Sequence, residues 1–115
     1  MFEFIESLTN TRTMSIKKQY LKNNEVCKVT FSLKTDLENV ETVRIPGDFN
    51  GWDTNCEPMK KLKTGGFTQT MKFNTGNSYQ FKYLVNDSEW RNDPEADKFE
   101  PNNTGPGEVN SVIET

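Results

Sequence analysis

A tryptophan on a glycine-containing turn is the first residue of this chain that could do chemistry. Trp52 lies in the stretch Gly47-Asp-Phe-Asn-Gly-Trp-Asp53, directly after an expected strand. A large aromatic side chain on a loop has few structural roles, whereas a flat ring can stack on the apolar C–H face of a pyranose. The turn therefore indicates a sugar-stacking position at Trp52.

A second tryptophan and a lysine extend this hypothesis. Trp90 closes a later hairpin, and Lys82 lies on the strand leading into it. Strand alternation puts Lys82 and Gln80 on the face opposite the apolar side chains of that strand. If the Trp52 loop folds over this face, two indoles flank one ammonium group, and Lys and Asn side chains supply hydrogen-bonding groups for sugar hydroxyls. From the pattern alone, core packing for both tryptophans and mere solubility for Lys82 stay open as alternatives.

Catalysis is disfavoured by the residues the chain lacks. It contains no histidine, which excludes every His-dependent triad, dyad and metal site. Paired carboxylates remain, Asp48 with Asp53 or Asp93 with Glu95 and Asp97. A glycosidase needs two carboxyl groups facing each other across a cleft, one with a raised pKa, and surface loops of a thin sandwich rarely provide that. We expect no enzymatic activity and no cofactor.

Metal binding is also disfavoured. The stretch from Asp48 to Asp53 has a faint likeness to a calcium loop, but its glycine falls at the fourth position and no bidentate Glu closes a twelve-residue loop. Cys27 is expected in a strand and Cys56 in a loop, so each is expected to be a free thiol. No metal ligand set is predicted.

The bulk composition restricts the partners. The 115 residues suit one domain, carry a net charge of −3, and include eight Phe, three Tyr and two Trp for a core. The one short basic run, Lys60 to Lys63, is interpreted as a solvated loop, so nucleic acid is not expected. No signal peptide or bilayer-spanning stretch is evident, so we expect a cytoplasmic protein without membrane contact.

The expected elements begin with residues 1–24, an N-terminal extension that we expect to be partly helical or flexible. Ile16, Tyr20 and Leu21 have helical spacing, and Thr13 or Ser15 would cap a short helix. From residue 25 to residue 115 the period changes to two. Strands are expected at 26–34, 40–45, 67–73, 79–85, around Trp90 and at 109–113, with a loop of about twenty residues after 46 and another at 93–107.

These short strands with turns between them predict an all-β fold, an immunoglobulin-like antiparallel β-sandwich, with the helical extension at its N-terminus. A parallel sheet is disfavoured because no long helical segment connects any two strands.

Five motifs in sequence order also carry a resemblance to a known family. They are Val43-Arg-Ile-Pro-Gly-Asp-Phe-Asn-Gly-Trp-Asp53, Pro58-Met59, Tyr79-Gln-Phe-Lys-Tyr-Leu-Val-Asn-Asp-Ser-Glu-Trp90, Asn92-Asp-Pro-Glu-Ala-Asp97 and Gly107-Glu-Val-Asn-Ser-Val-Ile113. Over about residues 26–115 the chain resembles carbohydrate-binding module family 48, the early-set domain at the front of isoamylases and glycogen branching enzymes. It is similar to the glycogen-binding domain of the AMP-activated kinase β subunit. It also resembles small stand-alone bacterial early-set proteins, which begin with a stretch like 14–22.

The resemblance implies a domain that binds α-1,4-linked glucans and has no active site. It implies that sugar is held by Trp52, Lys82, Trp90 and Asn110, with assistance from Asn50 or Gln80. We therefore expect non-catalytic binding of a glycogen- or starch-like α-glucan. The alternative is a protein-interaction module that docks onto a glucan-processing enzyme or a regulatory partner.

Overall fold

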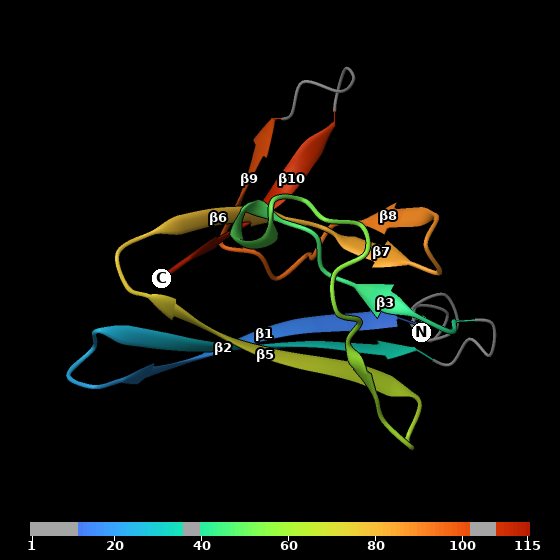
Figure 1. The fold of residues 1–115 in the computed structure, drawn as a ribbon, viewed down its shortest axis with the longest axis horizontal. Coiled ribbons are helices and arrows are strands. Elements are labelled where there is room, and N and C mark those ends of the chain that lie inside the picture. The colour runs from blue at the N-terminus through green and yellow to red at the C-terminus, as the bar shows by residue number, and fades with distance from the viewer. Residues whose placement is uncertain (1–11, 36–39, 102–107) are drawn as a thin grey trace, which may run out of the picture.

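The computed structural model describes residues 12–35, 40–101 and 108–115 (Figure 1). Over these residues the chain forms ten strands and one short 3₁₀ turn. They are β1 (Arg12–Leu21), β2 (Val26–Thr35), β3 (Val43–Arg44), η1 (Asp48–Asn50), β4 (Lys60–Lys61), β5 (Gly66–Asn74), β6 (Ser78–Phe81), β7 (Tyr83–Val85), β8 (Glu89–Arg91), β9 (Lys98–Pro101) and β10 (Val109–Glu114). All the pairings between these strands are antiparallel.

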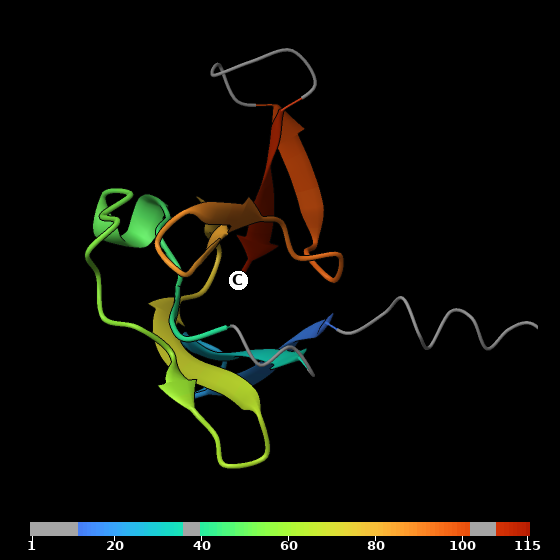
Figure 2. The same ribbon diagram turned by 90° about the vertical axis from the view of Figure 1, so that its right-hand side faces the viewer.

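The first layer is a sheet in the order β1-β2-β5-β4. Its long strands follow from strict alternation in β2, where Cys27, Val29, Phe31 and Leu33 are almost fully buried and the side chains between them are more exposed. This layer therefore presents one apolar face to the rest of the molecule, below the other strands in Figures 1 and 2.

The second layer is organised around residues 78–85, which form β6 and β7 with an interruption at Lys82. β6 pairs with β10, which pairs with β9, while β7 lies between β3 and β8. The β9–β10 pair rises away from the first layer in both views (Figure 2). The stretch 78–85 thus changes neighbours along its length, from β10 beside β6 to β3 and β8 beside β7.

The core lies between the two layers. Phe31 of β2 meets Phe81 edge-to-face at 5.3 Å between ring centroids, and Phe81 meets Tyr83 at 5.8 Å. The core also includes Val43, Ile45, Val85 and Ile113. The prediction of an all-β antiparallel sandwich is confirmed.

The helical prediction for the N-terminal part is wrong where the structure describes it. Residues 12–21 form β1, which pairs with β2 from Arg12↔Thr35 to Leu21↔Val26, and its Met14 belongs to the core. A spacing of four between Ile16 and Tyr20 fits a strand face as well as a helix face. Pairing with β2 decided between the two, and residues 1–11 lie outside the described residues.

Two further expectations differ in detail. The segment 93–107 was predicted as loop, yet Lys98–Pro101 pairs with β10 as strand β9. The strand predicted at 40–45 is assigned only at Val43–Arg44. Cys27 and Cys56 are free thiols, as predicted. Over the described residues there is no helix of the length and apolarity that a bilayer crossing requires.

Candidate functional site

The turn that carries Trp52 is held by the side chain of Asn50. Its Oδ1 accepts hydrogen bonds from the backbone N–H groups of Gly47 (3.0 Å) and Asp53 (3.2 Å), and its Nδ2 donates to the carbonyl of Ile45 (3.0 Å). These bonds fold the chain back on itself directly after the β3 region. Asn50, a predicted sugar contact, is thus engaged within the turn.

Trp52 adopts a backbone conformation that is unusual for a bulky residue. Its φ is 58°, in the left-handed region, and follows Gly51 at 70°. The backbone N–H of Trp52 donates to the Gly47 carbonyl (2.9 Å), and its indole Nε1 donates to Asp48 Oδ1 (2.9 Å). Strained conformations of this kind persist where the surroundings over-determine them, and they cluster at functional sites.

Asp48 connects this turn to the second layer. Its other oxygen, Oδ2, accepts the backbone N–H of Gln80 on β6 at 2.8 Å. The side-chain oxygen of Gln80 in turn accepts from Asn110 Nδ2 on β10 at 2.9 Å. A chain of hydrogen bonds therefore runs from the Trp52 indole through Asp48 and Gln80 to Asn110.

Lys82 lies where its strand changes neighbours. Along one edge, the segment that follows β3 continues to pair with this strand. The Lys82 N–H donates to the Pro46 carbonyl at 3.1 Å, and Gly47 forms a bridge with Phe81. On the other edge, β10 pairs as far as Ser111↔Phe81, and β8 begins at Tyr83↔Arg91. Two strands diverge at this point. The Lys82 side chain emerges at the fork, on the face that it shares with Gln80.

Both polar side chains at the fork are largely covered. The Lys82 side chain is 12% exposed, and its Nζ lies 3.4 Å from Oε1 of Glu108. Asn110 is 8% exposed. Only a small part of each group therefore reaches the surface.

Trp90 is much more open. It pairs with Leu84 across β7 and β8, so the two side chains share a face. Leu84 is buried, at 3% exposed, while Trp90 keeps 43% of its surface in solvent. The indole thus has the buried Leu84 as its cross-strand neighbour and remains accessible to solvent.

The structure links five of the six predicted residues, either by hydrogen bonds or by a shared strand face. Trp52 and Asn110 are joined through Gln80, Lys82 is two positions along the same strand face as Gln80, and Trp90 lies opposite Leu84 on that face. Sequence reasoning missed Asp48 as the connector, Glu108 as the partner of Lys82 and Leu84 as the support of Trp90. No periodicity signals these contacts: Asp48 meets Gln80 and Lys82 meets Glu108 from segments distant in sequence, and the Leu84–Trp90 pair depends on the register of the β7–β8 hairpin.

The carboxylate pairs do not make a catalytic arrangement among the described residues. Asp93 is fully buried, where Oδ2 accepts from the Tyr83 hydroxyl (2.7 Å) and Oδ1 from the Glu95 backbone N–H (2.8 Å). Burial raises the pKa of the Asp93 carboxyl, and these hydrogen bonds act in the opposite direction. Burial, followed by the nearby Asp93 charge, raises the pKa of the Tyr83 hydroxyl well above its ordinary value. In the described part of the chain, no group of three or more His, Cys, Asp or Glu side chains is placed to hold a metal.

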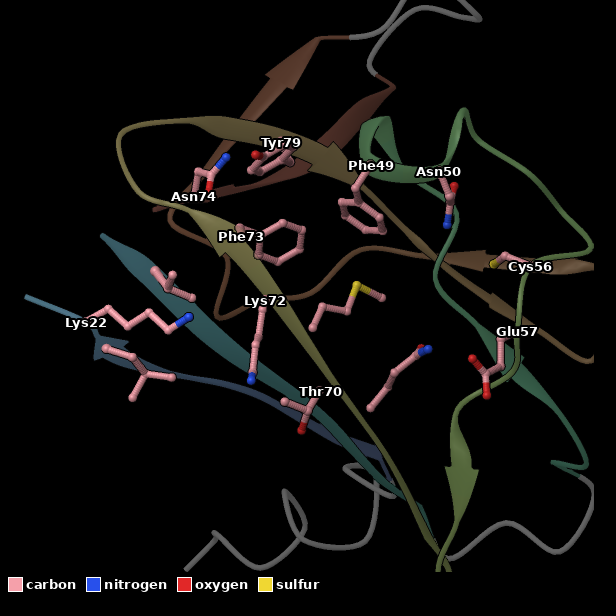
Figure 3. Close-up of a pocket in the computed structure, with 14 residues that line it drawn as sticks. Lys22, Phe49, Asn50, Cys56, Glu57, Thr70, Lys72, Phe73, Asn74 and Tyr79 are labelled. Atoms are coloured by element: carbon pink, nitrogen blue, oxygen red, sulfur yellow. The ribbon is translucent and has the colours of Figure 1, made fainter. Parts of the chain in front are cut away.

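A hollow lies elsewhere in the described part of the chain. It has a volume of about 780 Å³ and opens between β5 and the segment from η1 toward β4 (Figure 3). Of the predicted sugar-binding residues, Asn50 alone lines it. Most of the predicted sugar-binding residues therefore lie outside this hollow, which is a separate feature.

Comparison with known proteins places the chain. No curated protein matches it. A protein family described as the glycogen recognition site of AMP-activated protein kinase matches residues 29–115, a stretch that starts within β2 and includes η1, Lys82, β8 and β10. With most of its length matched, the chain belongs to this family of glycogen-recognition domains.

Proposed function

We propose that this domain binds α-1,4-linked glucan of the glycogen or starch type, without catalysing any reaction on it. The observation that carries the proposal is the hydrogen-bonded connection from Trp52 to the strand face where Trp90 is exposed. The family described as a glycogen recognition site supplies the class of ligand. Two aromatic rings held on one polar face are what a sugar chain requires.

The two indoles are the stacking platforms in this proposal. Trp90 offers an open ring backed by Leu84, and Trp52 offers a ring whose N–H is already satisfied by Asp48. Burying on the order of 100 Å² of apolar surface per indole contributes roughly 2–3 kcal/mol before entropic losses. Two such contacts imply binding nearer micromolar than nanomolar, which suits a polymer with many equivalent sites.

The polar residues orient the bound sugar through hydrogen bonds. Lys82 Nζ and Asn110 Nδ2 donate to hydroxyls of the same glucose units, while Gln80 and Asn50 act mainly by holding the neighbours in place. Glu108, beside Lys82, offers an acceptor for sugar hydroxyls.

Binding without catalysis fits the carboxylates at this face. Asp48 is occupied by the Trp52 and Gln80 N–H groups, and Glu108 lies beside the Lys82 ammonium, so both carboxylates are engaged in other contacts. A glucan-processing enzyme as an additional partner stays a prediction.

Migration in a native gel that contains glycogen tests the proposal. We expect the wild-type chain to be retarded, and Trp90→Ala and Trp52→Ala to lose most of the retardation, since each removes a stacking surface. Phe99→Ala is the matched control, because Phe99 is 44% exposed but pairs with Ser111, one position out of step with Asn110. Wild-type migration unaffected by glycogen would reject glucan binding and leave the protein-docking alternative.

A further inference from the structure

Within residues 12–35, 40–101 and 108–115, one edge of β5 has no neighbouring strand along most of its length. β5 pairs with β2 from Gly66 to Asn74, but with β4 only at Phe67 and Thr68. Among the described residues, no strand lies beside Gln69–Phe73 on the β4 side. An open strand edge of this length is a template for pairing with another chain.

The backbone groups that point out from this edge follow from the register. Leu62 N–H donates to the Gly66 carbonyl, so the backbone carbonyl of Gly66 points toward β4. Alternation along an antiparallel strand then directs the N–H and C=O groups of Thr70 and Lys72 outward on the same side. At the far end, the Asn74 carbonyl points the same way and accepts from Thr115 Oγ1 at 2.8 Å. The open stretch is therefore bounded at both ends.

The hollow described above lies directly against this edge (Figure 3). Its apolar lining includes Phe49, Met71, Phe73 and Tyr79, which belong to the core or pack against it. Gln69, also in the lining, has a buried Oε1 without a hydrogen-bond partner. Such an acceptor is costly unless a donor approaches it. The sandwich is open here, with room between β5 and the η1 segment.

The outer face beside the edge is positively charged. Lys72 pairs with Lys28 across β5 and β2, and Lys22 lies at one end of the hollow. The ion pairs found among the described residues include none of these three lysines. Like charges directly opposite each other on a sheet are destabilising. The opposite wall carries one acid, Glu57.

We propose that the free edge of β5 accepts an extended segment of a partner protein as an added strand. The partner has apolar side chains at alternate positions, which enter the hollow over Met71 and Phe73, and acidic side chains between them, which face Lys72 and Lys28. Main-chain hydrogen bonds to Thr70 and Lys72 supply the pairing, the mode known as strand addition. A stretch of five residues spans about 17 Å in this conformation.

A sugar fits this hollow less well than a peptide. The ring planes of Phe49 and Phe73 are inclined by 52° and those of Phe49 and Tyr79 by 63°, so they offer no common flat platform. The outward N–H and C=O groups of β5 recur at the spacing with which a second strand pairs, which suits a peptide backbone. The inference is therefore independent of glucan binding at the Trp90 face.

Titration of the full chain with a synthetic peptide tests the inference. The probe is acetyl-Thr-Val-Glu-Phe-Glu-Val-Thr-amide, followed through backbone amide NMR signals and hydrogen exchange. We expect saturable shifts centred on β5 and slower exchange at the Thr70 and Lys72 amides. Lys72→Glu should weaken binding about tenfold. Lys17→Glu, an exposed charge reversal on β1, should leave binding unchanged.

Two control measurements sharpen the result. A peptide with lysines in place of both glutamates, and a peptide N-methylated on its paired backbone nitrogens, should both fail to bind. Trp90→Ala should bind the probe as wild type does, which separates this surface from the glucan face. Absence of saturable binding up to about 1 mM, shifts centred away from β5, or equal binding of the N-methylated peptide would overturn the inference.

Discussion

Asp48 joins two parts of the candidate site that the chain order keeps apart. One carboxylate accepts two N–H groups, from the Trp52 indole and from the Gln80 backbone. A single side chain thereby orients a stacking ring and fixes it to the strand that leads to Lys82. We therefore propose that Asp48 is a positioning residue, whose contribution to sugar binding passes through Trp52.

Replacing Asp48 tests this role. Asp48→Ala should weaken binding of maltoheptaose roughly five- to tenfold, because the loss of about 1 kcal/mol of hydrogen bonding frees the ring. The affinity of Asp48→Asn should fall between those of wild type and Asp48→Ala, since its one carbonyl oxygen can accept either N–H while its amide group faces the other. Calorimetric titration measures both. Asp53→Ala is the control, because Asp53 is exposed and caps only the Asn55 backbone N–H. An Asp48→Ala variant with wild-type affinity would refute the positioning role.

Asp93 predicts a pH dependence of stability. Because burial raises its pKa in the folded state above the ordinary value of 3.8, the folded chain binds the proton more tightly than the unfolded chain does. The contribution of this group therefore favours folding most at about pH 3.8 and below, and declines as pH rises through the raised pKa. The Asp93→Asn variant has no ionisable carboxyl group at this position and therefore lacks this pH-dependent contribution to stability.

Urea unfolding at a series of pH values checks the sign. The free energy of unfolding of wild type, relative to Asp93→Asn, should increase as pH falls toward 4. A difference that stays constant with pH, or that decreases on acidification, would show that burial does not raise the pKa of the Asp93 carboxyl.

The fork at Lys82 is the feature of the strands that creates the site. A regular strand from 78 to 85 would carry one neighbour per edge, but here β10 and β8 share one edge and diverge at Lys82. The side chain of Asn92, next to β8, bridges the gap by donating to the Val109 carbonyl (3.1 Å) and accepting from the Ser111 hydroxyl (2.7 Å). The opening is thus built into the pairing and is held at a defined width.

Gly47 permits the close approach of the Trp52 turn to this strand. An added Cβ would lie 2.6 Å from the Gln80 carbonyl oxygen and 2.8 Å from Phe81 Cβ. Gly47→Ala should therefore cost about 1–3 kcal/mol in the free energy of unfolding and weaken sugar binding by displacing η1. Gly51→Ala meets no atom within 4 Å and should cost only about 1 kcal/mol, from its positive φ. Urea unfolding distinguishes the two, and wild-type stability in Gly47→Ala would contradict the packing argument.

Much of the strand content could be predicted, because apolar side chains recur at most alternate positions of β2, β5 and residues 79–85. β1 could not, since the spacing of Ile16 and Tyr20 suits helix and strand alike and only pairing with β2 resolves it. β9 lies in a segment rich in proline and acids, where composition favoured a loop. The tryptophan positions followed from turn and hairpin chemistry, but the pairing of Leu84 with Trp90 depends on the register of the β7–β8 hairpin, and the Asp48 connection joins segments distant in sequence.

The domain presents two surfaces of different character. The outer face of the second layer carries the exposed Trp90, to which the Trp52 turn is connected through Asp48 and Gln80, and the β5 edge carries a hollow, three lysines and backbone groups that no described strand pairs with. The first suits a polysaccharide and the second an extended acidic peptide. Because the two surfaces lie on different elements, we propose that both ligands bind one molecule at the same time, which would let a glucan-bound domain recruit a protein.

The indole N–H signals of the full chain give the most direct test of glucan binding. The sequence contains two tryptophans, so two such signals report the two proposed platforms individually. On titration with maltoheptaose we predict that both signals shift and saturate together, while cellohexaose, with β-1,4 linkages, leaves them in place. Signals that stay fixed with maltoheptaose, or that respond equally to both sugars, would contradict α-glucan recognition by Trp52 and Trp90.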